Sequence, residues 1–313
     1  MKKLPIALSL LTLATTLFSC GESSKIETPQ EGEITIAADE SLKPIVDAQV
    51  MAYNAHYPKA VIHVKYLPEQ KAIKMMLDDS AEIAFVTRGL TVSEQDVYFK
   101  SKKLPYQPAT MALDGVAIIA NKANADTNIT VPELKSMFDG SANNKIKLVF
   151  DNSNSSNLYY MMNKLGIKDI SKANIEAANG NEEVIEYIKK DHNAIGFIGG
   201  NWISDMDDKK AVDFKKAVRI MAVAEKQNAT VYYLPNTYDL KARKYPLERK
   251  MILHTKETVW GVAKGFIRFS CAQIGQLVTE KMGLVPYYNL PRTVVLDDKS
   301  LAEQDKQKDV FRR

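Results

Sequence analysis

The chain has 313 residues, of which 45% are hydrophobic, and its formal net charge is only +4. This length and composition support one large domain or two modest ones, and they exclude a chain too polar to fold. Because Lys and Arg are interspersed with Asp and Glu, there is no basic stripe, and the sequence indicates no nucleic-acid partner.

The first nineteen residues have the pattern of an export signal. Lys2 and Lys3 precede an apolar run from Ile6 to Leu17, which is shorter than the ~20 residues that span a bilayer. The signal ends in Leu17-Phe18-Ser19-Cys20, which resembles the bacterial lipobox. We therefore expect residues 1–19 to be removed and Cys20 to carry lipid. The alternative is a plain secretory signal, or a short membrane anchor, with an incidental cysteine.

A polar stretch follows the signal, and residues 20–32 are predicted to form a flexible lipidated tether. The chain has two cysteines. If Cys20 carries lipid, Cys271 has no partner for a structural disulfide, and we expect its thiol to behave as a small buried hydrophobe.

Short apolar runs alternate with amphipathic stretches from residue 33 onward, which is typical of an α/β protein. Runs such as Val116 to Ile119 are continuously apolar, which favours strands in a sheet that is covered on both faces. In chain order, the predicted strands are 33–37, 61–66, 82–86, 115–121, 146–150, 194–198, 219–224, 229–234 and 250–255. The predicted helices are 41–57, 70–77, 91–100, 131–138, 155–165, 182–190 and 259–282.

Local enzyme and metal motifs are absent from the sequence. The four histidines stand at positions 56, 63, 192 and 254 without zinc-site spacing. No glycine-rich phosphate loop and no G-x-S-x-G elbow occurs, so no metal and no cofactor is expected. A hydrolase that uses Ser155 or Ser156 is a weaker alternative, and it requires a basic side chain beside the hydroxyl.

Three predicted strand-to-helix turns carry side chains suited to an oxyanion. They are Asp39-Glu40-Ser41, Thr87-Arg88 and Asn154-Ser155-Ser156-Asn157. A helix start offers free N–H groups and about half a positive charge, hydroxyls add donors, and Arg forks onto oxyanions. The alternative is that the polar residues only cap their helices and that Arg88 is solvated.

In this order and spacing, the segments resemble the phosphate-type, PstS-like solute-binding proteins of bacterial ABC transport, in the form common among Bacteroidota. The resemblance is carried by 34–44, 81–91, 114–121, the Ser/Asn turn, 194–198, 245–254 and 265–286. It implies a type II periplasmic-binding-protein fold, with mixed sheets flanked by helices in two lobes and two hinge crossovers between them. Lobe 1 would be 33–108 plus 246–297, lobe 2 would be 109–245, and 298–313 a charged tail.

The chain departs from this family in its ligand turns. The family usually has an Arg before a Ser-Gly-Thr turn and an Asp after the third strand, whereas here Asp151 precedes the turn and Thr87-Arg88 follows that strand. Asp39 or Glu40 is expected to take over the acceptor role toward the proton of hydrogen phosphate.

The resulting hypothesis is a non-enzymatic lipoprotein that faces the periplasm, is held to the membrane through Cys20, and captures a small oxyanion. Phosphate is the first candidate, and the protein partner is a membrane permease or another envelope complex. The alternative is an envelope interaction or sensor lipoprotein that kept the fold with altered or lost ligand binding.

Overall fold

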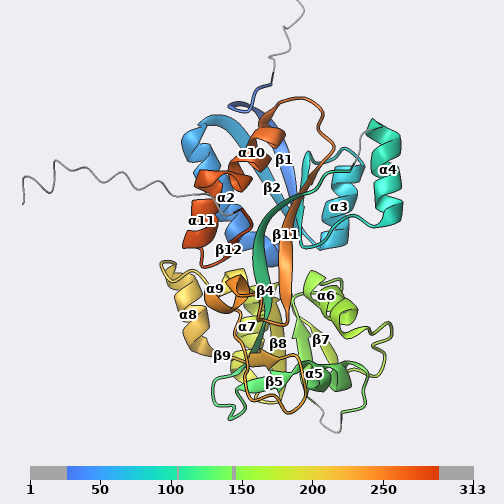
Figure 1. Ribbon diagram of the computed structural model, residues 1–313, viewed down its shortest axis with the longest axis vertical. Coiled ribbons are helices and arrows are strands. Elements are labelled where there is room, and N and C mark those ends of the chain that lie inside the picture. Colours follow the sequence, from blue (N-terminus) through green and yellow to red (C-terminus); the bar gives the residue numbers. More distant parts are fainter. Residues whose placement is uncertain (1–26, 104–105, 143–145, 289–313) are drawn as a thin grey trace, which may run out of the picture.

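The computed structural model describes residues 27–103, 106–142 and 146–288, so the predicted signal, Cys20 and the tail 298–313 lie outside the described residues. Figure 1 shows two lobes stacked along the long axis. Two long strands, β4 (Ala109–Asn121) and β11 (Glu248–Thr255), run along this axis between the lobes. The predicted two-lobed α/β fold with mixed sheets is confirmed.

The upper lobe in Figure 1 is built on a mixed sheet. Strand β1 (Glu31–Asp39) pairs in parallel with β2 (Lys59–Leu67) and β3 (Ile83–Val86). Strand β11 then pairs antiparallel with β3 and with the first half of β4. The helices of this lobe are α2 (Lys43–His56), α3 (Glu69–Leu77), α4 (Val92–Lys102), α10 (Val262–Cys271) and α11 (Gln273–Lys281).

Alternate residues of β1 serve the two faces of this sheet, as the strand period of two requires. Ile34 and Ile36 pack with α2 and α10, whereas Ala37 packs with α3 on the opposite face. Both faces are therefore covered.

The second half of β4 belongs to the lower lobe. It pairs antiparallel with β8 (Ala194–Gly199) and β9 (Val218–Ile220), while β8, β6 (Lys147–Phe150) and β7 (Ile175–Ala177) are parallel. The helices of this lobe are α5 (Val131–Phe138), α6 (Ser156–Leu165), α7 (Asn181–Lys190), α8 (Lys209–Ala217) and the short α9 (Thr237–Lys241).

The shorter elements of the whole described chain are β5 (Asn128–Thr130), β10 (Ala222–Ala224), β12 (Val285–Pro286) and the 3-10 turns η2 (Glu40–Leu42) and η3 (Gly200–Trp202).

The helix predicted over 259–282 is wrong as a single element. It starts later, at Val262, and an extended residue, Ala272, divides it into α10 and α11. The strand predicted at 219–224 is likewise divided into β9 and β10, and 229–234 contributes only a bridge from Tyr233 to Val223. Helix α8 was not predicted because it is so polar that Ala211 is its only buried residue.

The predicted tether is shorter than expected. The Tyr53 hydroxyl donates to the carbonyl of Pro29, the Val262 N–H donates to Glu27 Oε1 at 3.3 Å, and β1 already begins at Glu31. Residues 27–32 are therefore part of the folded lobe. Cys271 is a half-buried free thiol, and burial raises its pKa to about 11. Among the described helices, none has the length and apolar character needed to cross a bilayer.

The contact between β8 and α7 depends on Gly196. A Cβ atom there would lie 2.7 Å from Val184 Cγ1 and 2.9 Å from Ile188 Cγ1. We predict that Gly196→Ala lowers the free energy of unfolding by about 1–3 kcal/mol, because the helix must move away from the sheet. Urea denaturation measures this change.

The matched control is Gly89→Ala. A Cβ atom at Gly89 would meet only the Tyr106 hydroxyl, at 3.4 Å, so we expect a change within about 0.5 kcal/mol. Equal losses in the two variants would contradict the packing argument.

Candidate functional site

Two of the predicted turns face each other between the lobes. Ser41, in the turn that follows β1, and Ser156, at the start of α6, place their hydroxyl oxygens 3.2 Å apart although 115 positions separate them. Local capping holds both turns. Asp39 Oδ1 accepts the Ser41 N–H at 2.7 Å, and Ser155 Oγ accepts the Leu158 N–H at 3.3 Å. The capping alternative and the meeting of the two turns are therefore both observed.

Arg249 lies at the centre of this interlobe contact. It stands opposite Asp114 in the register of β11 and β4, and its Nε and Nη2 donate to Asp114 Oδ2 at 3.2 and 2.9 Å. Its Nη1 donates to Ser41 Oγ at 3.1 Å and to Asn157 Oδ1 at 2.8 Å. The Arg249 and Asp114 side chains are 1% and 0% exposed, so one desolvated guanidinium joins both lobes.

The carboxyl of Asp39 is a second acidic group of this polar cluster, beside that of Asp114. Burial raises its pKa, although Ser41, Arg249 and Ser156 oppose the shift. Within the described part of the chain, its second oxygen, Oδ2, is buried without a hydrogen-bond partner. Since a buried oxygen without a partner is unfavourable, this atom has an unused capacity for a hydrogen bond at the Ser41–Ser156 contact.

The lower lobe also holds the backbone of Ser41. Asn201 Nδ2 and Trp202 Nε1 each donate to the Ser41 carbonyl at 2.9 Å. The strand before these residues ends in Gly199, where a Cβ atom would lie 2.6 Å from Arg249 Nη2 and 2.7 Å from the Ser41 carbonyl oxygen. Only glycine permits this close approach of β8 to the cluster.

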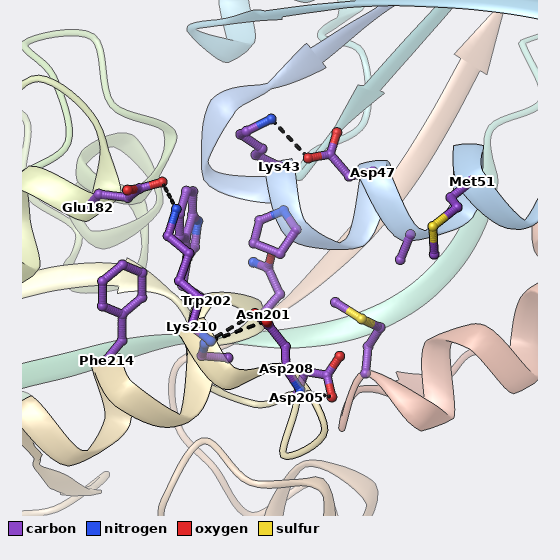
Figure 2. A pocket seen from close by; sticks show the side chains of 14 residues that line it. Lys43, Asp47, Met51, Glu182, Asn201, Trp202, Asp205, Asp208, Lys210 and Phe214 are labelled. Carbon is purple, nitrogen blue, oxygen red and sulfur yellow. Dashed lines mark hydrogen bonds and ion pairs between the residues drawn. The ribbon is translucent and has the colours of Figure 1, made fainter.

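A cavity of about 300 Å³ lies between the lobes beside this cluster, with Asn201 and Trp202 in its wall. Figure 2 shows α2 of the upper lobe on one side of it and α8 of the lower lobe on the other. Four of its charged groups pair within their own lobes: Lys43 with Asp47 at 2.8 Å, and Lys210 with Glu182. The lobes are therefore in contact at the polar cluster, and the cavity lies between them beside it.

Two further predicted residues lie at the edge of the contact. Glu40 is half-buried and accepts a hydrogen bond from the Asn152 amide of the other lobe. Burial raises the pKa of Glu40, and the Asn152 hydrogen bond opposes this. Asn154 is exposed, and its backbone N–H donates to Asn152 Oδ1 at 2.7 Å, so the structure uses Asn154 for the shape of the turn.

Thr87 and Arg88 have their donors directed to carboxylates of the upper lobe. Thr87 donates its N–H and its hydroxyl to Glu69 Oε1 at 2.7 and 2.6 Å. Arg88 forks onto Glu94 at 2.8 and 2.9 Å and lies 3.3 Å from Glu69. The Arg88 hydrogen bonds lower the pKa of Glu94 to about 2. These two residues are not brought to the Ser41–Ser156 contact.

The hydrolase alternative requires a His or Lys side chain beside the hydroxyl of Ser155 or Ser156. Ser155 donates to Asp151, and the Ser156 hydroxyl contacts that of Ser41. In the ranges that the structure describes, neither serine hydroxyl is hydrogen-bonded to a His or Lys side chain. An activated serine nucleophile needs such a partner.

Sequence reasoning missed Arg249, Asp114, Asn201 and Trp202. A signal existed for the first two, because each is a charged residue within or beside an apolar strand segment, and a buried charge must be paired. The sequence does not show that these two residues pair, because they are 135 positions apart and meet only through the register of β4 and β11.

The fold and this buried interlobe contact define a two-lobed binding protein. Residues 23–273 match a family model described as a PBP superfamily domain, and the chain belongs to that superfamily. The match spans both lobes and every residue of the cluster.

Individual relatives agree with this assignment. The chain is 22% identical over 304 residues to protein SphX of Synechococcus elongatus, covering 91% of this chain and 86% of that protein. It is 22% identical over 302 residues to the phosphate-binding protein PstS of Staphylococcus haemolyticus, covering 91% and 88%. A Clostridium perfringens structure, described as a phosphate ABC transporter substrate-binding protein with bound phosphate, superimposes with a TM-score of 0.68 at 18% identity, covering 82% of this chain and all of that one. The predicted PstS-like resemblance is confirmed, whereas the Bacteroidota form stays a prediction.

Asp151 makes the stability of the folded protein depend on pH. Burial, and then the charge of Asp39, raise its pKa to about 7, against a hydrogen bond from Ser155. The folded protein thus holds a proton that the unfolded chain releases near pH 4. The free energy of unfolding must therefore fall as pH rises from about 4 to about 7, by up to ~4 kcal/mol from this group.

We predict that Asp151→Asn removes this contribution. Urea unfolding should give equal stabilities for the variant and the wild type near pH 4, with the variant increasingly more stable toward pH 7.5. Asp39 also titrates, so the variant keeps part of the slope, and the difference between the two proteins is the decisive quantity. A difference that does not change with pH would contradict the assignment.

Proposed function

We propose that the protein is an extracytoplasmic solute-binding protein that captures phosphate between its lobes and delivers it to a membrane permease. The observation that supports this most is the position of the Arg249 guanidinium, which lies on a connecting strand and reaches Ser41 of one lobe and Asn157 of the other. If the lobes part so that the 3.2 Å contact between Ser41 and Ser156 opens, a tetrahedral oxyanion placed there would meet this guanidinium, two hydroxyls and the start of α6. Helix starts and Arg are the groups that proteins use for oxyanions.

The burial of the cluster supports a small ligand. Ser41 and Asn157 are 0% exposed, and Ser156 and Arg249 are 3% exposed. Hydrogen bonds to an anion are strong in such a desolvated site. An organic substituent would have to pass through these closely packed side chains, so a free inorganic anion fits better than an ester.

The Asp39 carboxyl supports phosphate over sulfate. Near neutral pH a phosphate ion carries a proton and sulfate does not, so phosphate can donate a hydrogen bond to the unpartnered Oδ2. Once Asp39 is ionised, its charge repels a fully ionised sulfate. Asp39 therefore becomes the proposed acceptor, and Glu40, which is paired with Asn152, does not.

Lipidation at Cys20 is part of the proposal. It rests on the lipobox-like segment Leu17 to Cys20 and on the position of Glu27, which is packed against the upper lobe. A lipid at Cys20 would keep the lobes close to the membrane that holds the permease.

We predict that calorimetry at pH 8 detects phosphate binding and no sulfate binding. Arg249→Lys should weaken phosphate binding about 10- to 100-fold, because Lys keeps the charge but lacks the fork that joins Asp114, Ser41 and the anion. A thermal melt confirms that the variant is folded.

Arg88→Lys is the matched control, because the Arg88 guanidinium is directed to Glu94 and Glu69. It should change the affinity less than about twofold. If Arg88→Lys weakened binding as much as Arg249→Lys, the proposed site would be wrong. No heat with any oxyanion would instead favour the envelope sensor or interaction protein.

A further inference from the structure

The loop between β11 and α10 presents two apolar side chains to solvent. Val259 is 55% exposed and its neighbour Trp260 is 53% exposed. The loop lies at the upper end of the molecule in Figure 1, at the far end of the upper lobe from the lower lobe. Neighbouring exposed apolar side chains can form part of a contact site for a protein or a membrane.

The chain enters the fold beside this loop. The Val262 N–H, two residues after Trp260, donates to Glu27 Oε1 at 3.3 Å, and a Cβ atom at Gly261 would lie 3.0 Å from the Glu27 carboxyl carbon. Cys20 is seven positions before Glu27. Seven residues span at most about 25 Å, so a lipid at Cys20 would hold this end of the upper lobe close to the bilayer surface.

Two basic side chains lie beside the apolar pair. The Arg268 guanidinium lies 5.6 Å from the centre of the Trp260 ring, and Lys264 Nζ donates to the Thr258 carbonyl at 2.8 Å. Trp prefers the headgroup level of a bilayer, where its ring is buried and its N–H remains hydrated, and basic groups pair there with lipid phosphates.

We propose that the 258–260 loop is a membrane-contacting surface, in which Trp260 inserts among lipid headgroups beside Arg268 and Lys264. The proposal rests on lipidation at Cys20, and it goes beyond phosphate binding. The contact is weak by itself, but the tether raises its effective concentration at the surface. The protein then stands on the end of its upper lobe, with Asp39 and the cluster one strand length, about 30 Å, from the headgroups.

Tryptophan fluorescence tests this directly, because the chain has two tryptophans and the other, Trp202, is only 7% exposed. The lipoprotein is isolated from membranes and reconstituted in vesicles of phosphatidylcholine and phosphatidylglycerol, with or without brominated acyl chains. Subtracting the spectrum of Trp260→Phe from that of the wild type gives the emission of Trp260. This emission should be blue-shifted, and brominated lipid should quench it by about half or more.

The matched control moves the indole to the other lobe. Val231 is 56% exposed and lies two residues before Tyr233, which pairs with Val223 of the lower lobe. Val231→Trp in the Trp260→Phe background should show no quenching above that of Trp260→Phe.

Three results would overturn the proposal. They are an unquenched Trp260, equal quenching at positions 231 and 260, and a chain recovered without lipid. A Trp260 that is shielded only when a permease is present would instead make this loop a protein-docking surface.

Discussion

The buried pair of Arg249 and Asp114 is the interaction on which the rest of the structure depends. The two residues face each other on the two strands that connect the lobes, and neither charge reaches water. Removing either partner would leave an uncompensated buried charge, which is among the most unfavourable changes a core can undergo. The pair therefore fixes the register of β4 against β11 at the point where both strands pass between the lobes.

The pair also organises the polar cluster. Because Asp114 holds two guanidinium nitrogens, the third is directed at Ser41 and Asn157, one from each lobe. Asn201 and Trp202 hold the backbone carbonyl of Ser41 from the lower lobe. An arginine on a connecting strand can respond to an anion by drawing both lobes together, which an arginine confined to one lobe does less directly. In this chain the guanidinium joins the two connecting strands, and in the proposed complex it would also bind the ligand.

Much of the fold followed from local pattern. The continuously apolar run from Val116 to Ile119 predicted a strand covered on both faces, and its alternate residues do pack into two different clusters. Long-range register could not be read in the same way. The turns at Ser41 and Ser156 were predicted separately, but nothing local indicates that they touch. Arg88 was predicted as a ligand from its residue type and its place after an apolar strand, but its guanidinium is directed to Glu69 and Glu94.

In the proposed complex, the anion lies between Ser41, Ser156 and Arg249. A crystal structure with arsenate tests it most directly, because arsenic is located by its anomalous scattering and arsenate has the shape and protonation of phosphate. We predict one arsenic between the lobes, with the arsenate oxygens within hydrogen-bonding distance of both hydroxyls, the Arg249 guanidinium and Asp39 Oδ2. Arsenate bound at Arg88, or elsewhere on the surface while the Ser41–Ser156 contact stays closed, would contradict it.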